Sequence, residues 1–477
     1  MKFGKISIIL LAAAIGLPTI SVEAKSYKRG VSENVFQYHA QMQAIEEGVT
    51  WFYNWGNTLG NYIFDQEYME FCPMVWSGNY NADNIRKYAK SHPNCKYLLA
   101  FNEPNFKSQA NMTPALAAER WPAVKALADE LGLKIVAPAL NYSPDAPYNN
   151  PTTWMDEFVR LVGNDAFDFT AIHFYGGFGG MKDLCTQFHN RYGKPVWVTE
   201  FCYWPGEMGD VAASAQLSSM VESVEWLEKT DWIYRYAWFK ALEDNRANFK
   251  LIESGKGEDP RELTELGYVY VHMSDYDASV FHKVDEVVPA SEYINRQYAG
   301  LGKGNNPDCP KPIEVVNFNS GATIDYQFDI PESGNYNLVL TVTGVGEPTR
   351  FDPKLSVTAV KADGTEGSEL SPAQQFELPG NETDYKNVIY PLVLSAGKQT
   401  IRIKDVNTYA PSGLRISTLR LADAAGVGDI VVDSESKTVD VVNLQGVVIR
   451  RNVEPCRATD NLPAGMYIIG GQKVMVR

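Results

Sequence analysis

Short apolar runs alternate with helix-like segments over the first part of the chain. Such runs, without strict polar alternation, are typical of strands buried on both faces of a parallel sheet. Eight strands alternating with helices over about 245 residues predict an α/β fold, a (β/α)8 TIM barrel. The predicted strands are Lys28–Ser32, Val49–Gly56, Glu70–Gly78, Tyr97–Asn105, Lys134–Leu140, Phe169–Gly177, Pro195–Trp204 and Trp232–Ala241.

Helix signals fall between these strands. Thr113 and Pro114 supply a capping hydroxyl and a first-turn proline before a mixed apolar and polar run. The segment Leu263–Met273 is expected to form the closing helix of the barrel.

Beyond about Val287 the pattern changes to period two. Apolar residues alternate with polar ones from Ile324 to Ile330, and turn residues follow at 331–335. Further short strands are expected at Tyr336–Val342, Tyr390–Leu394, Thr400–Asp405 and Leu414–Leu421. We therefore predict a barrel over 25–285, an all-β sandwich over 286–423 and a small C-terminal β domain over 424–477.

The first 24 residues read as a signal peptide. Lys2 and Lys5 make the first five residues cationic, and an apolar core follows from Ile6 to Leu17. Ala24 ends a cleavage site of small residues. The apolar run is short for a membrane span. We expect a secreted or cell-surface protein, with no transmembrane segment after cleavage.

Charge and composition indicate which classes of ligand the protein can bind. The formal net charge is −15, which disfavours nucleic acid and anionic membranes. The aromatic residues (10 Trp, 26 Tyr and 21 Phe) favour sugar ligands, which stack on flat rings. No metal-binding pattern appears, so neither a metal nor a cofactor is expected. The six cysteines leave pairing open between Cys72 and Cys95 or Cys185 and Cys202, with free buried thiols as the default.

Two glutamates end predicted strands. Glu103 follows the fourth strand and Glu200 ends the seventh, and function in a barrel gathers at this edge. Either residue alone is more ordinary as a helix-terminal charge or an ion-pair partner. As a pair amid aromatic residues they favour glycoside cleavage, which needs a proton donor and a second carboxylate. Burial should raise the pKa of the donor.

Four tryptophans near strand ends are candidates for stacking glucosyl units, with core packing as the alternative for each. They are Trp55, Trp76, Trp204 and Trp238. Trp51 and Trp197, which lie earlier in their strands, are expected in the core.

The motifs KRGV, WFYNWG, PMVWSG, LLAFNEPN, IHFYGG and KPVWVTEF resemble glycoside hydrolase family 128, endo-β-1,3-glucanases of the retaining (β/α)8 clan. The resemblance implies Glu103 as general acid/base and Glu200 as nucleophile. It also implies that Asn102 holds the substrate 2-hydroxyl, and that Tyr175 steers the nucleophile with His173 beside it. Retention of configuration then predicts carboxylates about 5 Å apart.

Two further resemblances concern the β domains. The stretch GATIDYQFDIPESGNYNLVLTV is similar to family 6 and 35 carbohydrate-binding modules, and a purely structural sandwich is an equal alternative. The last residues resemble C-terminal sorting domains of the type IX secretion route, which implies possible cell-surface attachment.

Two alternatives to a secreted β-1,3-glucanase stay open. One is a related barrel acting on mannan or β-1,4-glucan, and the other is a non-catalytic glucan-binding protein.

Overall fold

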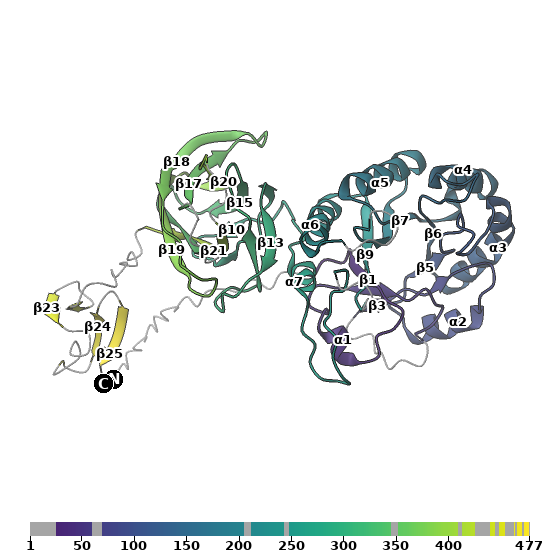
Figure 1. Cartoon of the computed structure of the whole chain (residues 1–477), viewed down its shortest axis with the longest axis horizontal. Coiled ribbons are helices and arrows are strands. Elements are labelled where there is room, and N and C mark those ends of the chain that lie inside the picture. The colour runs from purple at the N-terminus through teal and green to yellow at the C-terminus, as the bar shows by residue number, and fades with distance from the viewer. Residues whose placement is uncertain are drawn as a thin grey trace, which may run out of the picture.

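The computed structural model describes residues 25–59, 69–204, 211–242, 248–344, 352–408 and 413–424, and parts of the tail between 439 and 476. The predicted signal peptide lies outside the described residues. The chain forms a barrel with outer helices, a β-sandwich and a small sheet near the C-terminus (Figure 1).

The barrel sheet contains nine parallel strands in the order β3-β2-β1-β9-β8-β7-β6-β5-β4. Its strands are β1 (Arg29–Ser32), β2 (Trp51–Tyr53), β3 (Glu70–Phe71), β4 (Met74–Val75), β5 (Tyr97–Ala100), β6 (Lys134–Leu140), β7 (Phe169–Phe174), β8 (Val196–Phe201) and β9 (Ile233–Phe239). All eight predicted strands are present. Several end earlier than expected, because the polar residues after them form the loops of the site.

The two edge strands of this sheet are pieces of one extended segment. Only Cys72 and Pro73 separate β3 from β4. The Cys72 amide donates to Phe52 of β2 at 2.9 Å, and the Pro73 carbonyl accepts from Leu99 of β5 at 3.0 Å. The sheet therefore closes on itself, with the third barrel strand broken at the proline, which lacks an N–H for the ladder.

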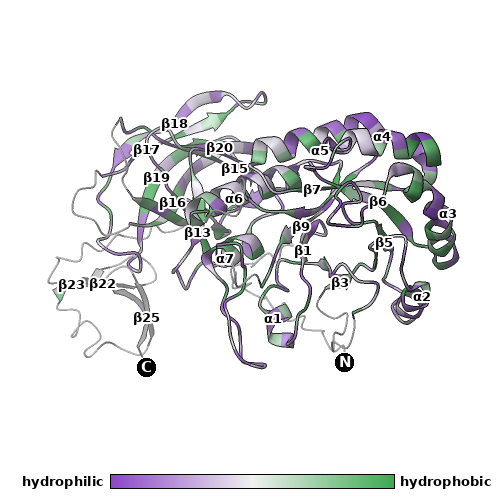
Figure 2. Cartoon of the chain, turned by 45° about the vertical axis from the view of Figure 1, so that its right-hand side comes forward, coloured by the Kyte–Doolittle hydropathy of each residue, from purple (hydrophilic) through white to green (hydrophobic). Residues whose placement is uncertain are grey.

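Helices cover the outside of this sheet (Figure 1). They are α1 (His39–Gln43), α2 (Ala82–Ser91), α3 (Pro114–Leu131), α4 (Pro151–Val162), α5 (Phe178–Tyr192), α6 (Ala213–Lys229) and α7 (Glu265–His272), with a 3-10 turn at Asn164–Ala166. The ribbons of α3 and α4 carry both hydrophobic and hydrophilic residues, as expected of helices with one face on a sheet (Figure 2).

The sequence signals at the start of α3 act as predicted. The Thr113 hydroxyl accepts a hydrogen bond from the Leu116 amide at 3.2 Å, and Pro114 occupies the first turn. Gly132 ends the helix with φ 68°, a conformation that favours glycine. This pair of caps fixes α3 between the fourth and fifth barrel strands.

Aromatic side chains fill the barrel interior beneath the site. Trp51 and Trp197 are fully buried, as predicted, and their rings lie 5.0 Å apart at a steep angle. The Arg235 guanidinium lies 4.7 Å from the Tyr97 ring and pairs with Glu70 at 2.6 Å. The charge is thus both paired and covered by rings, which is how a buried arginine is tolerated.

The sandwich consists of one mixed sheet, in which β10 runs parallel to β15, and one antiparallel sheet. The first has the order β10-β15-β20-β17-β18, with β12 on β15, and the second has the order β13-β14-β21-β16-β19, with β11 on β21. The five strands predicted from the sequence correspond to β15, β16, β19, β20 and β21. The sandwich strands are β10 (His282–Lys283), β11 (Val288–Pro289), β12 (Asn295–Gln297), β13 (Gly300–Lys303), β14 (Ile313–Val316), β15 (Thr323–Ile330), β16 (Gly334–Gly344), β17 (Lys354–Val360), β18 (Glu366–Gln375), β19 (Lys386–Leu394), β20 (Gly397–Asp405) and β21 (Leu414–Asp423).

A third unit near the C-terminus is a four-stranded antiparallel sheet in the order β23-β22-β24-β25. The turns predicted at 444–446 and 470–471 lie outside the described residues. Its strands are β22 (Val439–Asn443), β23 (Val448–Val453), β24 (Gly465–Ile469) and β25 (Gln472–Val476).

Two chemical properties of the described residues bear on the expectations from the sequence. Neither of the two cysteine pairs left open by the sequence forms a disulfide: Cys72, Cys95, Cys185 and Cys202 are buried thiols. Within the described ranges, no helix combines the length and the apolar character that crossing a membrane requires.

Candidate active site

Glu103 stands in the loop just after β5, held against the neighbouring strand β6. Its amide donates to the Ala139 carbonyl at 2.9 Å, and the Ala139 amide donates to Phe101 at 3.1 Å. Glu103 has φ 42°, a left-handed conformation that is costly for a non-glycine residue. The two backbone hydrogen bonds to β6 hold this conformation, so the direction of the carboxylate is set by the sheet.

Glu200 lies within β8 and is 3% exposed. Its carboxylate accepts hydrogen bonds from the Tyr53 hydroxyl at 2.8 Å and the Trp55 indole N–H at 2.7 Å, and also from the Tyr175 hydroxyl. These donors come from β2 and from the loops after β2 and β7. Three neutral donors on one carboxylate fix its orientation and favour its ionised form.

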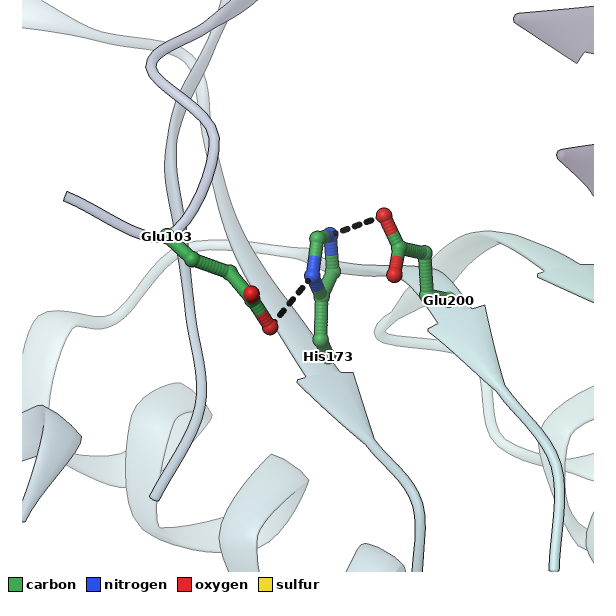
Figure 3. A group of neighbouring side chains, drawn as sticks. All are labelled: Glu103, His173 and Glu200. Carbon is green, nitrogen blue, oxygen red and sulfur yellow. Dashed lines mark hydrogen bonds and ion pairs between the residues drawn. The ribbon is translucent and has the colours of Figure 1, made fainter. Parts of the chain in front are cut away.

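His173 of β7 stands between the two glutamates, as Figure 3 shows. Its Nδ1 lies 3.0 Å from Glu103 Oε1 and forms a hydrogen bond with it. Its Nε2 lies 3.3 Å from Glu200 Oε1, close enough for an ion pair but without the alignment of a hydrogen bond. The ring is fully buried. His173 therefore contacts the two carboxylates, whereas the resemblance had implied only a place beside Tyr175.

The two carboxylates converge. One oxygen of Glu103 and one of Glu200 lie within 4.8 Å of each other. Both side chains keep a small exposed fraction, 9% for Glu103 and 4% for Glu200. The structure thus brings the two glutamates together at one edge of the barrel, and their catalytic roles stay predictions.

Burial raises the pKa of Glu200 above its usual value. The charge of His173 and the hydrogen bonds from Tyr175 and Trp55 offset part of that increase. Burial also raises the pKa of the Tyr53 and Tyr175 hydroxyls, and the charge of Glu200 raises it further. Both hydroxyls therefore stay protonated and act as donors.

The pKa of His173 is set by opposing effects. Burial disfavours the charged ring, but the charge of Glu200 and the hydrogen bond to Glu103 outweigh burial and raise the pKa. A protonated ring donates toward both carboxylates, whereas a neutral ring would turn a lone pair toward one of them. The arrangement favours one positive charge between the two glutamates.

Glu103, His173 and Glu200 are also the one group among the described residues with metal-ligating atoms close together. The geometry fits a chelate poorly, because the imidazole ring stands between the carboxylates and turns one nitrogen toward each (Figure 3). An ion bound by one nitrogen would have only one carboxylate beside it. The arrangement is therefore poorly suited to holding a cation.

Two amide side chains lie beside Glu103. Asn102 is 3% exposed, and its Nδ2 donates to Gln109 Oε1 at 3.3 Å. Asn102 Oδ1 has no hydrogen-bond partner among the described residues. On the other side, Asn141 Nδ2 lies 3.5 Å from Glu103 Oε1. An amide oxygen that lacks a protein partner is suited to receive a substrate hydroxyl.

The structure separates the four candidate tryptophans. Trp55, Trp76 and Trp204 are half-buried. Trp55 bonds directly to Glu200 through its indole N–H. Trp238 is a correction: it is fully buried, and its indole N–H donates to the Phe249 carbonyl at 2.8 Å, so no face is open to a sugar.

The correction has a simple cause in the strand. Adjacent residues of a strand point to opposite sides, and Trp238 packs outward against Tyr270 of α7, with the rings 6.0 Å apart. Its neighbour Phe239 is half-buried and lies 6.0 Å from the Trp55 ring and 5.3 Å from the Tyr175 ring. The aromatic residue that β9 contributes to the site is therefore Phe239.

Three residues of the site were missed in the sequence. Tyr53 lies two positions before Trp55 in the predicted strand Val49–Gly56, so alternation along that predicted strand would have placed both side chains on one side of the sheet. Phe239 follows from the same alternation once Trp238 is known to face outward. Asn141, directly after β6, carried no signal beyond its place at a strand end.

The loops that follow β2 and β4, together with the start of α2, line an open polar hollow of about 640 Å³. It lies at the same edge of the barrel as the glutamates, since both strands end there. Amide groups dominate the lining, together with one tyrosine and one arginine. The lining residues are Asn57, Asn79, Tyr80, Asn81, Ala82, Asp83 and Arg86.

Comparisons with known proteins agree with this site. The family model described as glycosyl hydrolase catalytic core matches residues 30–270. A glycoside hydrolase family 128 endo-β-1,3-glucanase from Pseudomonas viridiflava is 34% identical and covers 52% of this chain and 98% of that one, with a TM-score of 0.47. This chain belongs to glycoside hydrolase family 128.

Two further proteins are similar to this chain. A curdlan-specific exo-β-1,3-glucanase from Blastomyces gilchristii is 30% identical over 52% of this chain and 98% of that one, with a TM-score of 0.41. Alkali-sensitive linkage protein 1 of Schizosaccharomyces pombe is 24% identical over 235 residues, which are 48% of this chain and 41% of that protein. This chain thus spans less than half the length of that relative. The family membership inferred for the barrel is confirmed, and the resemblances of the two β domains stay predictions.

Proposed function

We propose that this protein cleaves β-1,3-glucan within the chain, by double displacement with retention of configuration. The observation that carries the proposal is the pair of glutamates at one barrel edge, with oxygens within 4.8 Å. Retaining glycosidases hold their carboxyl groups about 5 Å apart, whereas inverting enzymes need a wider gap for water. Membership of family 128 supports the substrate class.

Glu200 is the nucleophile in this proposal. Its carboxylate attacks the anomeric carbon while Glu103 gives its proton to the departing glycosidic oxygen, so the C–O bond breaks and a glycosyl–enzyme ester forms. Water then attacks the same carbon, Glu103 takes the water proton, and Glu200 leaves as a carboxylate. The three donors on Glu200 suit a group that must be anionic at the start of the reaction.

The Asn102 side-chain oxygen, which lacks a hydrogen-bond partner among the described residues, would accept a hydrogen bond from the 2-hydroxyl of the sugar at the scissile bond. Trp55, Trp76 and Trp204 are proposed stacking surfaces for glucosyl units, being half-buried near the strand ends. The amide-lined hollow beyond β2 and β4 gives a long glucan further polar surface. We also propose export of the protein, because of its leader-like first 24 residues.

Substituting each glutamate by glutamine tests these roles. Glu103→Gln and Glu200→Gln each keep the size of the side chain but remove the proton donor or the nucleophile, and activity on laminarin should fall by at least about 1000-fold. Glu119→Gln, an exposed position on α3, is the matched control and should keep full activity. Near-full activity of either active-site variant would contradict the role given to it.

The choice of polysaccharide separates the alternatives. Wild-type protein is incubated with laminarin, curdlan, mannan and cellulose, and reducing ends and product lengths are measured. Mixed oligosaccharides from laminarin or curdlan support endo cleavage of β-1,3-glucan, whereas single glucose units indicate an exo enzyme. Release from mannan or cellulose alone would move the substrate to another linkage, and binding without release would indicate a non-catalytic protein.

A further inference from the structure

Tyr142 is an exposed aromatic residue next to the proposed acid. It lies two residues after the end of β6, at the edge of the barrel that holds the glutamates, and is 47% exposed. Its neighbour Asn141 contacts Glu103 at 3.5 Å. Of the large apolar side chains exposed on the described part of the barrel, Tyr142 alone follows the carboxyl end of a sheet strand.

The backbone beneath Tyr142 is held on several sides. Asn105 Nδ2 donates to the Asn141 carbonyl at 2.8 Å and to the Tyr148 carbonyl at 3.2 Å. The Ser143 hydroxyl donates to the Asn105 carbonyl at 3.0 Å. The Tyr142 amide itself donates to Asn141 Oδ1 at 2.8 Å. The ring is therefore presented from a fixed loop that is bonded to the segment carrying Glu103.

The chemistry of the reaction defines which sugar lies on this side. An acid that protonates the departing oxygen must touch the bond to the leaving-group sugar. That sugar is therefore next to Glu103 and, on the side of Asn141, next to Tyr142. The other rings of the site, those of Tyr53, Trp55 and Tyr175, surround Glu200 instead.

We infer that Tyr142 is a stacking platform for a glucosyl unit on the leaving-group side of the scissile bond. The inference rests on the proposed function and deepens it, since it assigns a specificity-determining residue to the same site. An exposed ring on a fixed loop costs little conformational entropy to stack against the apolar face of a pyranose. Single exposed aromatic residues are common on protein surfaces, so its place beside the acid carries the argument.

Two substrates with different leaving groups test this inference. Laminari-oligosaccharides release a sugar, which would use Tyr142, whereas laminaribiosyl fluoride releases fluoride and needs no sugar there. In Tyr142→Ala, the ratio of kcat/KM for the oligosaccharide to kcat/KM for the fluoride should fall about tenfold. Tyr142→Phe keeps the ring and should restore the wild-type ratio.

Tyr27→Ala is the matched control, because Tyr27 is 54% exposed but precedes β1 at the opposite edge of the barrel. It should leave the ratio unchanged. If the ratio stays unchanged in Tyr142→Ala, either because neither activity falls or because both fall equally, the inference is overturned while the proposed function stands. Wild-type protein that cleaves neither substrate would instead overturn the proposed function, and the platform with it. Circular dichroism confirms that each variant is folded.

Discussion

At the scale of residues, the site is a row of three side chains in which the His173 imidazole lies between the two glutamates. His173 contacts both glutamates. Three neutral donors also contact Glu200, whereas the Asn141 amide contacts Glu103. This difference distinguishes the two carboxylates, because the hydrogen bonds donated to Glu200 favour its ionised form. In the proposed mechanism Glu103, with the imidazole and an amide as neighbours, is the group that exchanges a proton.

Tyr175→Phe tests the role of these donors through the pH profile. The Tyr175 hydroxyl lowers the pKa of Glu200, which burial has raised, so losing it raises that pKa further. Glu200 must be ionised to attack, and the acidic limb of kcat/KM should therefore move to higher pH. At neutral pH, kcat/KM should fall about tenfold, the cost of a hydrogen bond to a charged group.

The control for this profile is Tyr268→Phe. The Tyr268 hydroxyl also donates to a glutamate, Glu262, at 3.0 Å, but on the exterior at α7. Its pH profile should match that of the wild type. An acidic limb that stays in place in Tyr175→Phe would show that this hydroxyl does not tune the nucleophile.

At the scale of elements, close backbone packing positions α7 on the barrel. A Cβ placed on Gly267 of α7 would lie 1.9 Å from the Leu251 carbonyl oxygen, which belongs to backbone and cannot move aside easily. We expect Gly267→Ala to destabilise the protein by on the order of 1–3 kcal/mol. Thermal unfolding followed by circular dichroism measures the effect.

Gly179→Ala is the matched helical control. A Cβ on Gly179 of α5 would meet nothing within 4 Å. Alanine is the better helix former, so the free energy of unfolding should increase by up to about 1 kcal/mol. The melting temperature should rise accordingly. A fall of the same size in both variants would contradict the packing argument.

The elements also show what the sequence can predict. The eight barrel strands were predictable because strands buried on both faces form continuous apolar runs. The same feature hid the direction of each side chain: without polar alternation, Trp238 and Phe239 were equivalent in the sequence, and the wrong one was chosen. Glu200 was predictable from its place at a strand end, but its contact with His173 depends on the register between β7 and β8, in which the two residues are partners.

At the scale of the whole molecule, the sandwich docks on the outside of the barrel, against α6 and α7 (Figure 1). Arg296 of β12 pairs with Glu225 of α6 at 2.8 Å, and the Lys303 ammonium lies 4.0 Å from the Tyr268 ring. The Ser274 hydroxyl donates to Glu292 at 2.7 Å across the junction. These contacts join segments whose pairing has no local pattern, so the sequence predicted both units but not how they meet.

The central claim is that Glu103 and Glu200 cleave a glycosidic bond in two displacements. Proton NMR of the first products from a laminari-oligosaccharide tests it most directly, because the anomeric signals appear before mutarotation mixes them. Two displacements predict that the β-anomer forms first. Initial formation of the α-anomer would contradict the claim, since it requires a single attack by water.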